Sequence, residues 1–134
     1  MSIINSWFFT KTVIEWPVFE QATHNQYRVV SVRPYIDKKG KLPNGTSLTL
    51  QVIKDDFDYG VDKEGKPREN NLFQNFDATV LNDKIDVKKG DMVQLLGFDA
   101  ENSYVIGFDM LLRFKDAKVL HPQTPSQGVV KPNA

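Results

Sequence analysis

Two kinds of side chain in this sequence have chemistry to offer. Three lysines, Lys38, Lys39 and Lys41, fall within four positions on a turn that contains a glycine. Phe57 and Tyr59 stand in a strongly charged loop, where a solvent-exposed aromatic ring needs a partner. Clustered ammonium groups attract phosphate-like anions, and aromatic faces stack on planar rings. The two sets together suit a ligand that has both features, although solvated turn lysines are the simpler alternative.

The distribution of charge along the chain favours an anionic ligand, although the net charge does not. The chain has 17 Lys or Arg and 17 Asp or Glu, so its net charge is zero. Residues 26–54 carry six Lys or Arg against one Asp, a net charge of +5, and residues 55–86 carry four against nine, a net charge of −5. A basic half of a barrel attracts an anion even in a neutral chain. An unevenly charged soluble surface is the alternative.

The composition excludes several classes of protein. With 134 residues, one domain with its own core is expected. The chain has no cysteine, which excludes disulfides, a zinc-thiolate site and a thiol nucleophile. No run of about 18 apolar residues could span a membrane, and the N-terminus does not read as a signal peptide. We therefore expect a cytoplasmic protein.

No motif for catalysis or metal binding is present. His24 and His121 lie at the margins of the expected domain without the context of a metal site or a triad. The acidic loop after Asp55 resembles the start of a calcium loop, but position twelve counted from Asp56 is Pro67, where a glutamate is required. A phosphate-cradling glycine loop is also absent. We predict no enzyme activity, no metal and no cofactor.

From residue 26 onward the pattern predicts β-structure, because β-branched and aromatic residues alternate between turn signals. The expected strands are residues 26–36, 47–55, 71–81, 91–98 and 103–114. In the last of these, every second residue from Tyr104 to Phe114 is apolar, which predicts that these side chains share one face of the strand. Residues 82–90 leave room for about one helical turn.

Five strands with helical room only between the third and fourth is the order of the OB-fold, a five-stranded Greek-key β-barrel. We therefore expect an all-β OB-fold over residues 26–120, with an SH3-like barrel or a small β-sandwich as the alternative. Residues 121–134 contain three prolines and little to bury, which predicts a disordered C-terminal tail.

Residues 1–25 are rich in apolar side chains that fit neither alternation nor a helical stripe. We expect an extended N-terminal arm, with too much apolar surface to be left in water. It either packs on its own domain or docks on a neighbouring subunit. The candidates for oligomerisation are Trp7, Phe8, Phe9 and Trp16.

The stretch VKKGDMVQLLGF, residues 87–98, resembles the segment of single-stranded DNA-binding proteins in which a Lys-Gly turn opens the fourth strand and a glycine closes it. The order of elements over residues 26–118 is also similar. The resemblance is greatest to the divergent proteins carried by conjugative plasmids and phages of Gram-positive bacteria, of the PrgE kind. The chain departs from the family in ending with KPNA instead of an acidic tail, and in lacking tryptophan in the strands.

In an OB-fold, nucleic acid lies across the second and third strands and the loops after the first and fourth. That geometry selects a set of basic and aromatic residues in this chain. They are Arg33, Tyr35, Lys38, Lys39, Lys41, Lys54, Phe57, Tyr59, Lys66, Arg68 and Phe73. Phe73 has burial in the core as its alternative.

The sequence thus predicts a non-catalytic protein that binds single-stranded DNA without sequence preference and self-associates through its N-terminal arm. Plasmid conjugation, phage growth or DNA replication would be the setting, and duplex or RNA is an open alternative ligand. A small β-barrel module for protein interaction or assembly, such as a phage structural component, is the competing hypothesis.

Overall fold

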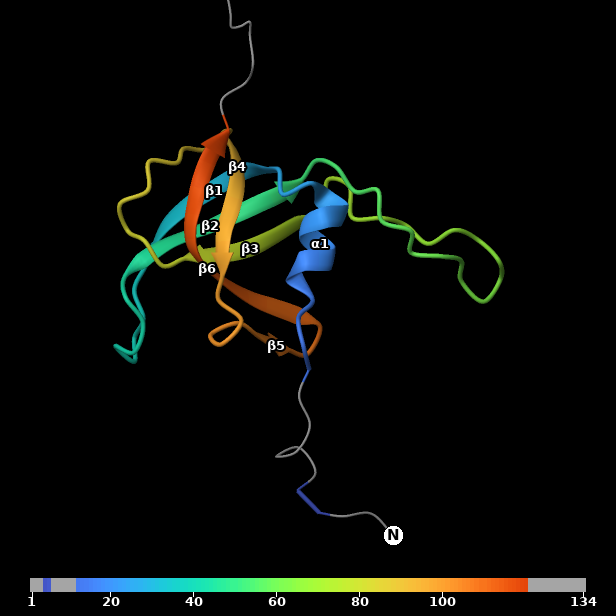
Figure 1. Cartoon of the computed structure of the whole chain (residues 1–134), viewed down its shortest axis with the longest axis horizontal. Helices are drawn as coiled ribbons and strands as arrows, with labels where there is room; N and C mark the ends of the chain where they lie inside the picture. The colour runs from blue at the N-terminus through green and yellow to red at the C-terminus, as the bar shows by residue number, and fades with distance from the viewer. Residues whose placement is uncertain (1–3, 6–11, 121–134) are drawn as a thin grey trace, which may run out of the picture.

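A computed structural model describes residues 4–5 and 12–120, which form six strands and one helix (Figure 1). The elements are α1 (Trp16–Thr23), β1 (Tyr27–Tyr35), β2 (Gly45–Val52), β3 (Asn75–Val80), β4 (Met92–Phe98), β5 (Tyr104–Ile106) and β6 (Asp109–Leu120). The predictions for Trp7, Phe8 and Phe9 and for the tail 121–134 lie outside the described residues.

The strands form a small, mostly antiparallel barrel-like sheet. Neighbouring strands follow the order β3-β2-β1-β4-β6-β5, and a short parallel pairing of β3 with β6 joins the two sides of the sheet. This pairing runs from Ala78 opposite Leu112 to Val80 opposite Phe114. The expected all-β class is confirmed at this level.

Alternation along β2 shows why these residues form strands. Leu48, Leu50 and Val52 are fully buried, whereas Thr49 and Gln51 point outward and remain partly exposed. The period of two places every apolar side chain of the strand inside the barrel. The predicted alternation is therefore confirmed.

The helix α1 lies where an extended N-terminal arm was expected. Residues 82–90, expected to hold a helical turn, form only turns and irregular backbone. Instead Trp16–Thr23 is helical, with Pro17 in its first turn, where the missing amide hydrogen costs nothing. The helix ends at His24 and Asn25, both in the left-handed region, and the Asn25 amide exchanges two hydrogen bonds with the backbone of Leu95.

Trp16 joins this helix to the barrel. Its side chain is 2% exposed, and its ring lies 4.8 Å from that of Phe114 and 5.9 Å from that of Phe98. Phe19, Tyr27 and Phe76 complete the contacts. Trp16 therefore packs on its own domain, and its proposed role in oligomerisation is wrong.

The expected fifth strand, 103–114, is also wrong, because it is a hairpin. Ile106 pairs with Asp109, so Gly107 and Phe108 form a two-residue turn. Gly107 has φ +59, the conformation that a tight hairpin turn requires at its first central residue and that glycine adopts freely. The chain reverses there, and β6 continues to Leu120.

Replacing Trp16 with alanine should lower the free energy of unfolding by about 3–5 kcal/mol, since it removes a large buried ring among five aromatic neighbours. Urea denaturation followed by circular dichroism measures the change. Val18→Ala, at a 43% exposed position of the same helix, should change it by less than about 0.5 kcal/mol. Equal effects of the two substitutions would contradict the packing.

Candidate nucleic-acid interface

On the outer face of β1, β2 and β3, hydroxyl groups surround the guanidinium of Arg33. Arg33 donates from Nη1 to Ser31 Oγ at 2.7 Å and to Thr49 Oγ1 at 3.3 Å, and from Nη2 to Ser47 Oγ at 3.4 Å. Thr49 in turn donates to the carboxylate of Asp77 at 2.8 Å. Arg33 is thus held across the strands while remaining exposed, as an interface for a polyanion requires.

The loop between β1 and β2 presents the three predicted lysines on a fixed turn. The Asp37 carboxylate accepts hydrogen bonds from the backbone amides of Lys39, Lys41 and Leu42. These bonds, the one from Leu42 foremost, lower the pKa of Asp37. Because the loop is tied from within, the exposed side chains of Lys38, Lys39 and Lys41 point outward from a defined backbone.

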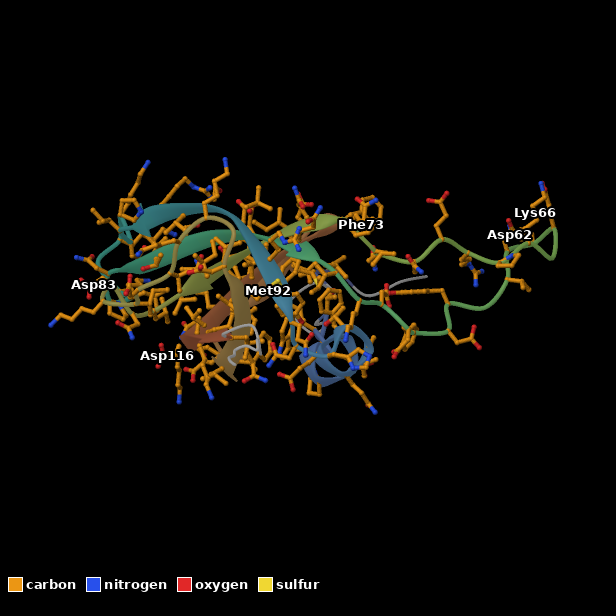
Figure 2. All side chains as sticks on the ribbon, turned by 90° about the horizontal axis from the view of Figure 1, so that it is seen from above. Asp62, Lys66, Phe73, Asp83, Met92 and Asp116 are labelled. Carbon is orange, nitrogen blue, oxygen red and sulfur yellow. The ribbon has the colours of Figure 1, made fainter. Side chains whose placement is uncertain are left out.

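Residues 53–74 form a long loop that extends away from the barrel (Figures 1 and 2). This loop is called the arm from here on and is distinct from the expected N-terminal arm. At its tip the backbone amide of Asp62 donates to Lys66 O at 2.8 Å, and the Asp62 carboxylate accepts from the amides of Glu64 and Lys66. Figure 2 shows Asp62 and Lys66 far from the strands. Midway along the arm, the Arg68 guanidinium donates to Tyr59 O at 2.8 Å. Lys66 and Arg68 therefore belong to the arm, not to the sheet.

Asp55 organises the base of this arm. Its carboxylate accepts from the Asn71 amide at 2.7 Å, the Tyr59 hydroxyl at 2.8 Å and the Phe57 amide at 3.1 Å. Burial acts to raise the pKa of Asp55, but these bonds outweigh it and the pKa is lowered. Burial and the bond to Asp55 raise the pKa of Tyr59.

Phe57 and Tyr59, the aromatic pair of the charged loop, contact each other. Their rings lie 4.8 Å apart in an edge-to-face arrangement, and the Tyr59 hydroxyl is occupied by Asp55 and Asn71. Packing within the arm therefore accounts for Tyr59, while Phe57 keeps 43% of its surface exposed. Lys54 is exposed at the start of the same arm.

Phe73 is the aromatic residue most openly presented among the predicted site residues. It lies where the arm rejoins the sheet (Figure 2). Its side chain is 65% exposed, so the alternative prediction that Phe73 is buried in the core is wrong. Its backbone has φ +67, a strained conformation for a residue with a side chain. The backbone amide of Phe73 donates to Val52 O, and its carbonyl oxygen accepts from Gln51 Nε2. These two hydrogen bonds hold the residue in place. Strain retained at an exposed ring is typical of functional positions.

Tyr35 belongs to a cluster that sequence reasoning missed. The Arg113 guanidinium lies 5.9 Å from the ring of Tyr35 and 5.5 Å from that of Tyr104, distances typical of cation–π contacts. Arg113 also donates to Asn102 O at 2.6 Å. The signal in the sequence is a lone arginine in the apolar run MLLRF.

The predicted residues therefore do not gather at one place. The β1–β2 loop, which carries Lys38, Lys39 and Lys41, lies at the lower left in Figure 1, whereas the arm leaves the barrel at the opposite end. Arg33 lies on the outer face of the sheet, and Phe73 lies at its junction with the arm. A ligand that touches all three regions must run along the barrel.

Two further kinds of site are not found in the described part of the chain. Residues 4–5 and 12–120 contain no group of three or more His, Asp or Glu side chains placed to hold a metal ion. Within the same ranges, α1 is too short to cross a membrane.

Comparisons with family models, curated proteins and solved structures find no match to this chain.

The order of the backbone at the base of the arm should depend on the negative charge of Asp55. A lowered pKa means that the carboxylate stabilises the arm above the ordinary aspartate pKa of about 3.9, and that this support is lost as the pH falls through the lower folded value. The chemical shift of the backbone amide of Asn71, followed by NMR, should therefore titrate below pH ~3.9.

Asp55→Asn should accelerate hydrogen exchange over residues 55–71 at neutral pH, because the acceptor of three hydrogen bonds loses its charge. Glu69→Gln, on the same arm at an exposed position, is the matched control and should leave exchange unchanged. Identical exchange in Asp55→Asn and wild type would show that the arm is ordered by other contacts.

Proposed function

We propose that this chain is an OB-fold protein without catalytic activity that binds single-stranded DNA regardless of sequence. The observation that carries the proposal is the circular strand order β1-β2-β3-β6-β4, closed by the parallel pairing of β3 with β6. This is the order of a five-stranded OB barrel when β5 is counted as an extension of the hairpin before β6. No metal or cofactor enters the proposal.

The proposed path of the DNA crosses the outer face of β1 and β2, beside the Asp77 carboxylate of β3. Lys38, Lys39 and Lys41 lie at one end and attract phosphates, Arg33 holds the backbone at the middle, and Phe73 offers a ring to a base at the far end. The hydroxyl-rich sheet surface between them supplies hydrogen-bond donors that tolerate any sequence. Stacking contributes a large share because the chain has no net charge.

Self-association belongs to the same proposal. Since Trp16 is fixed in the core, the residues before the helix, Trp7, Phe8 and Phe9, are the ones left to dock on a neighbouring subunit. Contacts between neighbours favour cooperative coating of a long strand. A cytoplasmic role on transient single strands, in plasmid conjugation, phage growth or replication, fits this behaviour.

A protein-interaction module is the second candidate, and one observation favours it. The β5–β6 hairpin exposes the apolar side chains of Tyr104, Ile106, Phe108 and Met110 to solvent. Exposed apolar patches of this kind mark contact sites for other proteins. If the module hypothesis alone is correct, the protein binds no single-stranded DNA at low salt.

Fluorescence anisotropy with a labelled oligothymidine at several salt concentrations tests the DNA-binding proposal. Lys38→Glu/Lys39→Glu/Lys41→Glu should weaken binding to every sequence alike and reduce the slope of log affinity against log salt by about 2, as expected for three lost phosphate contacts. Lys84→Glu/Lys115→Glu/Lys118→Glu changes the net charge equally at exposed positions elsewhere and should have a smaller effect. Equal losses would place the DNA away from the β1–β2 loop.

Phe73→Gly should separate binding from stability. Loss of a stacking ring should weaken DNA binding roughly 5- to 100-fold. The free energy of unfolding should change little, because glycine relieves the positive φ at a cost in chain entropy of about 0.5–1 kcal/mol. Leu72→Ala, next to it on the arm, is the control for binding. Unchanged affinity in Phe73→Gly would remove Phe73 from the interface.

A further inference from the structure

A cleft opens at the seam between β3 and β6. The parallel pairing of these strands begins only at Ala78 and Leu112. Within the described residues, no backbone hydrogen bond joins 75–77 to 109–111. The two strands separate toward α1 in Figure 1. The cleft between them has a volume of about 440 Å³, within the range of ligand sites.

The lining of the cleft is apolar at several points. Phe19 of α1, Phe76 of β3 and Met110 of β6 contribute to it, and Phe108 stands at its margin in the hairpin turn. Phe108 is fully exposed and Met110 is 40% exposed. A side chain that entered the cleft would cover apolar surface that is now in contact with water, which favours binding.

The charged groups of the cleft all have one sign. Asp77 and Asp109 line it, and the lining includes no Lys, Arg or His. Asp77 accepts one hydrogen bond from Thr49, and neither carboxylate has an ion-pair partner within the part of the chain that the structure describes. Such a surface repels phosphodiesters and attracts cationic side chains.

The backbone at the seam adds a second requirement. The facing edges of β3 over 75–77 and of β6 over 109–111 are not paired with each other. Free strand edges of this kind accept an added extended segment, whose main-chain bonds supply affinity and whose alternate side chains supply specificity. Three residues of edge extend over roughly 10 Å, which sets the minimum length of the occupant.

We propose that the β3–β6 cleft binds an extended segment of a partner protein in which apolar side chains alternate with lysine or arginine. The apolar side chains face Phe19, Phe76 and Phe108, the basic ones lie against Asp77 and Asp109, and the peptide backbone pairs with a free strand edge. This proposal goes beyond DNA binding and does not rest on it.

Ten-residue peptides with the probe sequence KVKIKVKIKV, and matched versions with Glu or Ser in place of Lys, test the proposal with the full chain by fluorescence anisotropy. The lysine peptide should bind roughly tenfold more tightly than the glutamate peptide, as two exposed charge pairs supply. Asp77→Asn/Asp109→Asn should abolish this preference, and Phe108→Ser should weaken all three peptides. N-methylation of alternate peptide bonds in the probe should remove binding, because it blocks strand pairing.

Several results would overturn the proposal. The first is a dissociation constant above about 1 mM for every peptide. Another is an equal affinity for the lysine and glutamate peptides. Displacement of the lysine peptide by oligothymidine in the Phe73→Gly variant would assign the cleft to nucleic acid. Tighter binding of a peptide that copies residues 6–14, SWFFTKTVI, would assign it to a second copy of this chain.

Discussion

The aromatic contacts of Trp16 are the interaction on which the rest of the structure depends. The strands bring Tyr27, Phe76, Phe98 and Phe114 to the core of the barrel. The helix before the first strand supplies Trp16, the ring that contacts all four. Edge-to-face and offset contacts of this kind favour one arrangement of the rings over others. The helix is thus an integral part of the core, although it precedes the barrel in the chain.

Hydrogen bonds at the end of the helix also hold the start of the arm in place. A buried hydrogen bond of 2.6 Å joins Thr23 to the hydroxyl of Tyr27, and burial raises the pKa of that hydroxyl well above its ordinary value. One residue beyond α1, His24 lies 2.6 Å from the Asp56 carboxylate, and the Asp56 amide donates to Ala22 O. The arm therefore starts from a fixed point, and its other end is held where the amide of Phe73 donates to Val52 O.

Alternation predicted the strands because burial inside a barrel repeats every two residues, and Leu48, Leu50 and Val52 follow that period. It failed at Tyr104–Phe114, because an uninterrupted period of two cannot reveal that the chain reverses at Gly107. The helix was missed because its eight residues carry apolar side chains on the exposed side as well, such as Val18. Among the site residues, the loop lysines could be predicted from local turn chemistry, whereas Arg113 required the contact between distant strands that places it against Tyr35.

Zero net charge conceals a spatial separation with functional consequences. The β1–β2 loop presents three lysines, and the β3–β6 cleft is lined by two carboxylates without a cation. The two surfaces meet at Thr49, which accepts a hydrogen bond from Arg33 and donates one to Asp77. In the two proposals, the loop lysines attract a polyanion and the cleft carboxylates attract a basic peptide. Because Asp77 lines the cleft and also contacts Thr49 of the proposed DNA surface, the two proposed ligands would meet at this carboxylate, and binding of one would change the electrostatics felt by the other.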